Sequence, residues 1–171
     1  MKEFVKIPEK RRRILKKDKS LIKKIEDLAR TRIGLEEDVS IEGESFDIYQ
    51  TKQVFKAFGR GFDMKDALDL LDDGYGLEII DLSELIKSDK RMVVVKSRII
   101  GTRGKTKKAI EDMTETKVAV QGKTVSLLGE WDKISVSKQA VMMLIDGCSH
   151  KTLYRWLEKK VSENQWQMKA L

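Results

Sequence analysis

Two glycines three residues apart, Gly101 and Gly104, lie within a strongly basic stretch of the chain. Between Lys96 and Lys108 there are six basic residues and no acidic one. Because glycine has no Cβ atom, the backbone at these positions can come close to a sugar-phosphate chain. A helix that starts just after the loop would add free N–H groups and the positive end of its dipole. The pattern predicts binding of a phosphate backbone rather than a reaction.

We expect this stretch to contact RNA in two ways. Its basic side chains would make charge-assisted hydrogen bonds to phosphates, and its apolar neighbours would floor a groove for unstacked bases. The groove floor is assigned to Ile99, Ile100, Val118 and Val120. The full set of predicted contacts is Lys96, Arg98, Ile99, Ile100, Gly101, Thr102, Arg103, Gly104, Lys105, Thr106, Lys107, Lys108, Val118 and Val120.

The glycine spacing alone is a weak signal, because loops before helices often contain two glycines for conformational reasons. The context strengthens it, since the loop is expected to follow a strand and an apolar pair and to precede a helix and two strands. The same residues include Gly104-Lys105-Thr106, the ending of a nucleotide-binding P-loop. That motif needs another glycine five residues before Gly104, where this chain has Ile99. The P-loop interpretation fails on this spacing.

An enzyme would need clustered metal ligands or a nucleophile beside a base. The chain has one histidine, one cysteine and scattered carboxylates, which excludes the usual zinc ligand sets. Glu111 and Asp112 recur 85 residues earlier as Glu26 and Asp27, which indicates that they orient or solvate a repeated helix. We therefore predict no enzyme activity, no catalytic residue, no metal and no cofactor.

The chain contains an internal repeat. Residues 25–33 match residues 110–118 at a constant offset of 85, with four identical and three conservative positions. Downstream, residues 39–43 match 118–122 if six residues are inserted. Two copies of one small fold are the simplest explanation. We expect domains at 1–86 and 87–171, the first ending in an acidic helix and linker.

Each copy is expected to follow the order β-α-α-β-β-α, an α+β fold with a three-stranded sheet packed by helices. The first strands are predicted at 3–7 and 92–96, which are β-prone runs, and later strands at 117–121 and 124–128. Apolar residues at helical spacing predict the first helices. These residues are Leu21, Ile22, Ile25 and Leu28 in the first copy, and Ala109, Ile110 and Met113 in the second.

Two further helices are predicted near the C-terminus. The inward face of the first is assigned to Ile134, Val141, Leu144, Ile145 and Cys148, the cysteine acting as a small buried hydrophobe. The second would either pack on the second copy or dock a partner through Leu153, Trp156, Leu157 and Val161.

In the first copy, the glycine loop aligns with Lys16-Lys17-Asp18-Lys19, which has no glycine. Residues 10–24 nevertheless include nine basic residues and one acidic residue. They would touch phosphates weakly or form a solvated helix face. Secondary contacts to RNA or a partner are assigned to Arg11, Arg12, Arg13, Lys16, Lys17, Lys19, His150 and Arg155.

The charge balance of the 171 residues favours a polyanionic partner. There are 35 Lys and Arg residues against 28 Asp and Glu residues, a formal net charge of +7. Charge alone does not separate RNA, DNA and membrane. The N-terminus lacks the apolar core of a signal peptide, and no apolar run approaches membrane-spanning length. We expect a cytoplasmic protein without a membrane partner.

Three stretches resemble the KH superfamily. They are Ala57-Phe58-Gly59-Arg60-Gly61-Phe62, Ile99-Ile100-Gly101-Thr102-Arg103-Gly104-Lys105 and His150-Lys151-Thr152-Leu153-Tyr154-Arg155-Trp156-Leu157-Glu158. With its degenerate first module, the chain resembles the ribosome-assembly KH proteins of the partner-of-Nob, or Dim-type, family. The resemblance covers nearly the whole chain and implies tandem type I KH domains with an extra C-terminal helix. The short N-terminus looks archaeal.

The resemblance implies binding of single-stranded RNA near the 3′ end of 16S rRNA, on the maturing small ribosomal subunit. The endonuclease that trims that end would be a neighbour, and archaeal relatives imply contact with a translation initiation factor subunit. The processome KH family with two similar modules is a close competitor. Two other functions stay open: a protein-interaction adaptor with incidental RNA affinity, and a general binder of single-stranded nucleic acid, DNA included.

Overall fold

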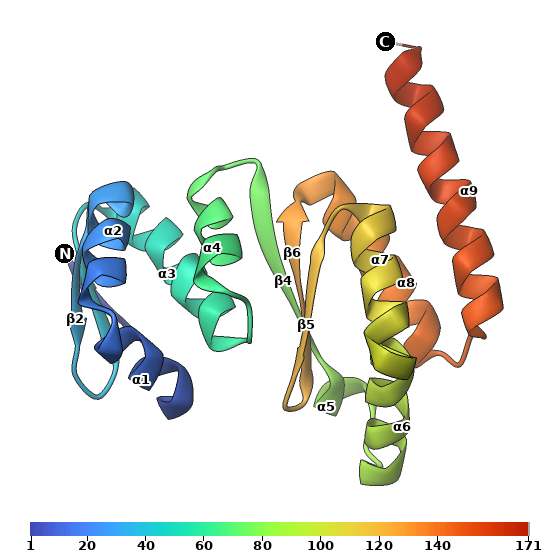
Figure 1. Ribbon diagram of the computed structural model, residues 1–171, viewed down its shortest axis with the longest axis horizontal. Coiled ribbons are helices and arrows are strands. Elements are labelled where there is room, and N and C mark those ends of the chain that lie inside the picture. The colour runs from blue at the N-terminus through green and yellow to red at the C-terminus, as the bar shows by residue number, and fades with distance from the viewer. Residues whose placement is uncertain (171) are drawn as a thin grey trace. The chain divides into compact units, whose positions relative to one another are not determined.

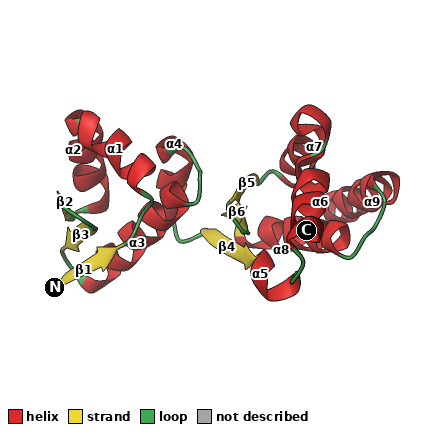
Figure 2. Cartoon of the chain, turned by 90° about the horizontal axis from the view of Figure 1, so that it is seen from below, coloured by secondary structure: helices red, strands yellow, loops and turns green. Residues whose placement is uncertain are grey.

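The computed structural model describes residues 1–170 and every side chain among them except that of Trp166. The chain forms two compact units, Met1–Leu77 and Glu78–Leu171, coloured from blue to green and from green to red in Figure 1. Each unit has its own three-stranded sheet, with helices covering one face of it (Figure 2). The units divide nine residues before the boundary expected at 86/87, because strand β4 (Tyr75–Asp81) belongs to the second sheet.

The first unit has the sheet order β1-β3-β2, with both strand pairs antiparallel. Its elements are β1 (Lys2–Val5), α1 (Glu9–Lys17), α2 (Lys19–Ala29), β2 (Arg32–Leu35), β3 (Val39–Glu42), α3 (Ser45–Gly59), α4 (Met64–Ala67) and the 3-10 helix η1 (Leu68–Leu71). Ile25 and Phe55 are fully buried in its core. Leu28, predicted on the inward face of α2, is instead 54% exposed.

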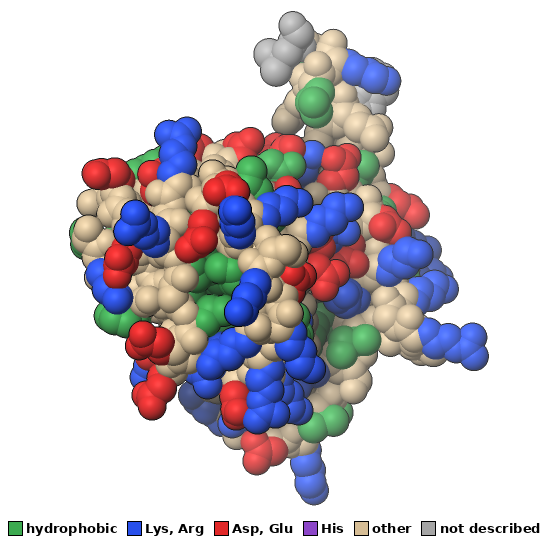
Figure 3. Space-filling model, turned by 60° about the vertical axis from the view of Figure 1, so that its left-hand side comes forward, with side chains coloured by type: hydrophobic (Ala, Val, Ile, Leu, Met, Phe, Trp, Pro, Cys, Tyr) green, Lys and Arg blue, Asp and Glu red, His purple; other side chains and the backbone are tan. Residues whose placement is uncertain are grey.

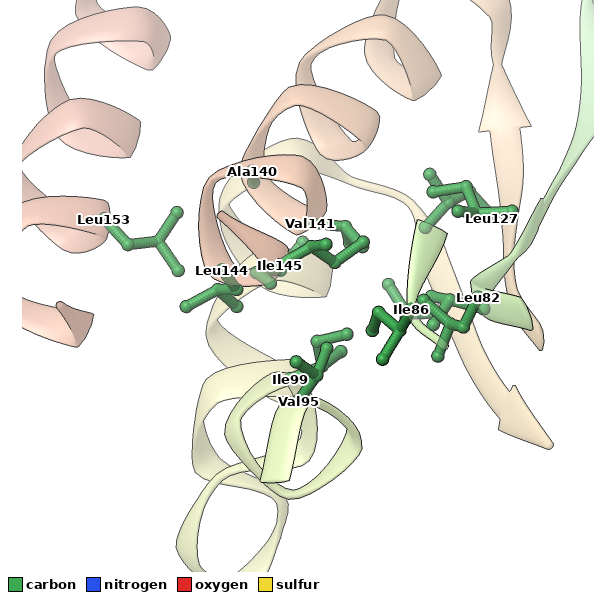
Figure 4. Packing of buried hydrophobic residues seen from close by; sticks show 14 of the residues in the cluster. Leu82, Ile86, Val95, Ile99, Leu127, Ala140, Val141, Leu144, Ile145 and Leu153 are labelled. Atoms are coloured by element: carbon green, nitrogen blue, oxygen red, sulfur yellow. The ribbon is translucent and has the colours of Figure 1, made fainter. Parts of the chain in front are cut away.

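The second unit has the sheet order β4-β6-β5. After β4 come α5 (Leu82–Leu85), α6 (Asp89–Ile100), the 3-10 helix η2 (Thr102–Gly104), α7 (Lys105–Thr114), β5 (Lys117–Gln121), β6 (Thr124–Glu130), α8 (Trp131–Ile145) and α9 (His150–Lys169). Its core brings together side chains from α5, α6, β6, α8 and α9 (Figure 4). Fully buried examples are Leu82, Ile99, Leu127, Leu144 and Leu153.

The predicted order β-α-α-β-β-α is confirmed in both units, but the strand predicted at 92–96 is wrong. Those residues lie in helix α6, which is capped by Ser88, whose Oγ accepts a hydrogen bond from the Arg91 amide (3.4 Å). Met92, Val95 and Ile99 recur at helical spacing and are buried on one side of α6. This packing overrides the strand propensity of the valines. The first strand of the second unit is β4, in the segment predicted to be a linker.

Matching hydrogen bonds confirm that the repeated glutamates orient their helices. Glu26 Oε1 accepts a hydrogen bond from the Ile33 amide (2.7 Å), and Glu111 Oε1 accepts one from the Val118 amide (2.8 Å). Each carboxylate thus ties a helix to the strand that follows it. The predicted match of 39–43 with 118–122 is wrong, because β3 pairs with β2 as β6 pairs with β5. Residues 39–42 therefore correspond to β6, not to β5.

Helix α9 packs on the second unit, one of the two outcomes left open by the sequence. Leu153 and Leu157 are fully buried, and Trp156 packs against the same core. Cys148 is only half-buried, contrary to expectation, because α8 ends at Ile145 and the chain turns at Gly147 (φ 95°). Within the described residues, no helix is both long and apolar enough to cross a membrane.

Candidate nucleic-acid interface

The glycine loop joins the end of α6 to the start of α7, so it follows a helix and not the predicted strand. Gly101, Arg103 and Gly104 all have positive φ angles, of 76°, 56° and 75°. A Cβ atom on Gly101 would lie 2.3 Å from Thr106 Oγ1 and 2.7 Å from the Thr106 amide nitrogen, so only glycine fits there. At Gly104 the space is open, and the left-handed conformation alone favours glycine. We call residues 101–104 the clamp loop.

The N-terminus of α7 is open to an anion. The first amides of a helix have no intrahelical acceptor, and among the described residues no side chain caps this end of α7. The first turn holds no acidic residue, so the positive end of the helix dipole is not neutralised there. The start of α7 therefore presents positive potential with no capping side chain in the way, which favours binding of a phosphate.

The corresponding helix start in the first unit is closed. Asp18 caps α2, its carboxylate accepting hydrogen bonds from the Ser20 hydroxyl (2.6 Å) and the Leu21 amide (3.0 Å). The Ser20 bond, and then the Leu21 bond, lower the pKa of Asp18 below its ordinary value. An ionised carboxylate thus occupies the place of an incoming phosphate. The first copy thus differs from the second both in this cap and in the missing glycines.

Several predicted contacts do lie at the surface around the clamp loop. Thr102, Arg103, Lys105 and Lys108 are exposed, and Ile100 is 36% exposed at the end of α6. The half-buried members of the predicted set are Lys96, Arg98, Gly101, Gly104, Lys107 and Val120. Lys107 forms an i,i+4 ion pair with Glu111, with Nζ 3.5 Å from Oε1. The free positive charge at the loop therefore comes mainly from Arg103, Lys105 and Lys108.

Three members of the predicted set are too deeply buried to offer side chains to RNA. The exposed fractions of Ile99, Thr106 and Val118 are 0%, 2% and 3%. Ile99 and Val118 belong to the core of the second unit, since each lies on the inward side of its helix or strand. The groove floor predicted from four apolar residues is thereby reduced to Ile100 and Val120.

Arg98 has a structural role that the sequence did not reveal. Its Nη1 donates a hydrogen bond to the Leu144 carbonyl (3.0 Å), and its Nη2 donates to the Cys148 carbonyl. A guanidinium is well placed there because the carbonyls at the C-terminus of α8 lack intrahelical donors. Arg98 thus fastens α6 to the end of α8, and its assignment as an RNA contact is corrected.

The start of α9 contacts the chain just before and just after the clamp loop. His150 Nε2 donates a hydrogen bond to the Arg98 carbonyl (2.9 Å), and Tyr154 Oη shares a hydrogen bond with Thr106 Oγ1 (3.2 Å). The two rings are stacked with their centroids 6.4 Å apart. His150 was predicted to be a contact residue, whereas Tyr154, whose partner is 48 residues away, was not predicted as a site residue. Arg155 is exposed.

The secondary set in the first unit divides into structural and exposed members. Arg11 donates to the carbonyls of Phe58 (2.9 Å) and Phe62 and stacks on the Phe58 ring, and burial lowers its pKa. Arg11 is therefore a fastening residue, which corrects its assignment as a contact. Arg13 pairs with Glu9 (2.6 Å).

Two of the exposed members lie at a groove of about 700 Å³ in the first unit. Lys16 and Lys19 line it, together with apolar side chains such as Ile22 and Leu35. Lys17 is also exposed, and Arg12 is half-buried. On the face shown in Figure 3, Lys and Arg side chains are interspersed with acidic and apolar ones. This unit therefore offers positive charge without a clamp.

Comparison with known proteins places this geometry in a family. The family model for the second KH domain of PNO1, described as a eukaryotic-type KH domain (KH-domain type I), matches residues 76–162. This range starts in β4 and includes the clamp loop. The chain belongs to the PNO1/Dim2 family of KH-domain proteins. The KH domain-containing protein MJ0443 of Methanocaldococcus jannaschii is 35% identical over 166 residues, which cover 92% of this chain and 73% of that protein.

Solved structures of PNO1/Dim2 proteins extend the likeness to both units. Dim2p from Pyrococcus horikoshii is 35% identical, with a TM-score of 0.83 and coverage of 93% of this chain and 99% of that one. A chain from the a/eIF2alpha-aDim2p-rRNA complex of the same organism is 34% identical, with a TM-score of 0.85 and 95% coverage of both chains. The predicted tandem type I KH fold is thereby confirmed.

The likeness to fungal PNO1 is partial. The pre-rRNA-processing protein pno1 of Aspergillus fumigatus is 37% identical over 111 residues, which cover 63% of this chain and 44% of that protein. This chain therefore spans less than half of the fungal relative.

Proposed function

We propose that this protein binds single-stranded ribosomal RNA through the clamp loop of its second unit and acts in maturation of the small ribosomal subunit. One observation carries the proposal: the uncapped N-terminus of α7, entered through Gly101 and Gly104 and flanked by exposed cations. The first unit has the same fold with this helix start closed by Asp18. RNA gripping is thus assigned to the unit whose helix start is open.

The chemistry is recognition without bond making or breaking. Phosphates would receive hydrogen bonds from the amides at the start of α7 and from Arg103, Lys105 and Lys108. Unstacked bases would lie toward Ile100 and Val120, where the surface is apolar and partly exposed. A clamp of this type holds about four nucleotides.

The relatives support an rRNA target. A Pyrococcus Dim2p was crystallised in a complex with rRNA and a/eIF2alpha, and the fungal relatives are pre-rRNA-processing proteins. We propose the 3′ region of 16S rRNA as the site on the precursor subunit, with the 3′-end endonuclease and an initiation factor subunit as neighbours. An adaptor function, in which RNA affinity is incidental, is the alternative that the test must exclude.

The test is a fluorescence-anisotropy titration of a labelled RNA copying the 3′ end of 16S rRNA. Wild type is compared with Thr102→Asp/Arg103→Asp, which reverses charge at two exposed loop positions; Asp tolerates the left-handed conformation of Arg103. Lys65→Asp/Gln167→Asp makes the same net charge change at exposed positions away from the loop. A scrambled RNA and the matching DNA serve as ligand controls.

Selective RNA binding that collapses in the loop variant, and persists in the control variant, is the expected result. Equal and weak binding of every oligonucleotide by all three proteins would overturn the RNA-clamp proposal and favour the adaptor. Equal affinity for the matching DNA would instead make the protein a general binder of single strands.

A further inference from the structure

Two α9 side chains hold the chain on both sides of the clamp loop. His150 Nε2 donates to the carbonyl of Arg98, three residues before Gly101 (2.9 Å). One helical turn later, Tyr154 Oη shares a hydrogen bond with Thr106 Oγ1, two residues after Gly104 (3.2 Å). The clamp loop is thus bracketed by one turn of a helix that lies outside the β-α-α-β-β-α unit.

Thr106 transmits this contact to the loop itself. It is 98% buried, and its Oγ1 lies 2.3 Å from where a Cβ of Gly101 would be. The Thr106 hydroxyl therefore lies close to both the Tyr154 hydroxyl and the Gly101 backbone. A shift of Thr106 would change the space that lets Gly101 keep its φ of 76°.

The residues that make these two contacts are themselves held in place by the core of the second unit. Leu153 and Leu157, on the same side of α9, are fully buried in the core of the second unit. Arg98, whose carbonyl receives the His150 hydrogen bond, is itself fixed through its guanidinium to Leu144 and Cys148. Left-handed residues such as Arg103 persist only where their surroundings determine them strongly, and α9 contacts the chain on both sides of Arg103, at Arg98 and Thr106.

We propose that His150 and Tyr154 are positioning residues that hold the clamp loop in its RNA-binding conformation, which makes α9 part of the RNA site without contacting RNA. This inference rests on the proposed function of the clamp loop. If α9 only stabilised the fold, loss of the Tyr154 hydroxyl would not act on the loop selectively. The positioning role predicts instead that this loss loosens the loop while the fold stays stable.

The first test is Tyr154→Phe, which removes the hydroxyl and keeps the ring. Ser162→Ala is the matched control: it also removes one hydroxyl hydrogen bond from α9, to the Glu158 carbonyl (3.0 Å), two turns beyond Tyr154. Hydrogen-deuterium exchange of the full chain without RNA is measured for the amides of residues 101–107, together with the Tm. We expect about fivefold faster exchange in Tyr154→Phe only, with similar Tm values for the two variants.

The second test measures RNA affinity of the same proteins and of two His150 variants. Gln can donate to the Arg98 carbonyl and Leu cannot, so His150→Gln should bind RNA close to wild type. Tyr154→Phe and His150→Leu should bind about fivefold more weakly, mainly through faster dissociation.

The outcomes separate the two proposals. If Tyr154→Phe leaves the exchange of residues 101–107 unchanged, Tyr154 does not hold the clamp loop, whether or not the wild type binds RNA. Faster exchange with unchanged RNA affinity overturns the claim that the His150 and Tyr154 contacts support RNA binding. If wild type binds no RNA, the proposed function fails, while the exchange result still decides whether α9 holds the loop.

Discussion

The carboxylate of Asp18 accepts a hydrogen bond from the backbone amide of Leu21 (3.0 Å). It thereby closes in the first unit the helix start that the clamp loop leaves open in the second. Two units with one fold thus differ at the position where a phosphate would bind. The contrast is electrostatic as well as conformational, because the cap is an ionised carboxylate at the positive end of a helix.

This cap makes the first unit sensitive to acid. The hydrogen bonds from Ser20 and Leu21 lower the folded-state pKa of Asp18, so the cap stabilises the fold above the unfolded-state pKa of about 3.9. That contribution is lost as pH falls through the folded-state pKa. Asp18→Asn keeps a capping oxygen at every pH. Thermal unfolding should therefore show Asp18→Asn gaining Tm relative to wild type below about pH 3.9, and a constant difference across pH 2 to 7 would contradict the cap.

The two clamp glycines should respond differently to alanine. Gly101→Ala places a Cβ atom against buried Thr106, whereas Gly104→Ala meets open space and suffers only from its positive φ. We expect losses in the free energy of unfolding of roughly 3 kcal/mol and 1 kcal/mol respectively, measured by urea denaturation. RNA affinity should fall at least tenfold in Gly101→Ala. Equal destabilisation by the two changes would show that Thr106 does not restrict Gly101.

Arg98 and Arg103 should separate stability from binding. Arg98→Ala breaks the hydrogen bonds to the end of α8, and we expect a loss of roughly 2 kcal/mol in the free energy of unfolding, with RNA affinity falling no more than the about fivefold expected when α9 releases the loop. Arg103→Ala should leave stability unchanged, weaken RNA binding, and reduce the slope of log affinity against log salt by about 0.7. Urea denaturation and anisotropy at several salt concentrations check both. A stability loss in Arg103→Ala together with a larger binding loss in Arg98→Ala would contradict both assigned roles.

The repeated glutamates should contribute equally to the two units. Glu26→Ala and Glu111→Ala each remove the acceptor of a strand amide, and each should lower the free energy of unfolding by about 1–2 kcal/mol. The Gln variants retain an acceptor oxygen and should recover most of that loss. Denaturation curves for the four variants provide the comparison. An effect in one unit only would show that the duplicated hydrogen bonds are not equivalent in energy.

Much of the fold was predictable because it depends on local patterns. Helical spacing identified α2, α7, α8 and α9, and the offset of 85 residues revealed that one element order occurs twice. The strand predicted at 92–96 failed because three consecutive valines suit a strand by propensity, whereas Ser88 and the buried face of α6 select a helix. Strand β4 was overlooked because its segment reads as acidic.

The site was predictable in position but not in detail. The sequence shows that Arg11, Arg98 and Arg103 are basic, but not that the first two donate to backbone carbonyls while the third faces solvent. The direction in which each arginine side chain points depends on tertiary packing, which charge patterns do not encode. Tyr154 lies in a stretch that carries the family resemblance, but its role could not be predicted, because its hydroxyl acts through a partner 48 residues away.

The most direct test of the RNA clamp is ultraviolet crosslinking of the full chain to an RNA that copies the 3′ end of 16S rRNA, with the crosslinked peptides identified by mass spectrometry. We predict crosslinks concentrated in residues 100–108 and 117–121, which are lost in Thr102→Asp/Arg103→Asp. Crosslinks confined to residues 10–24, or unchanged in that variant, would contradict the assignment of RNA gripping to the second unit.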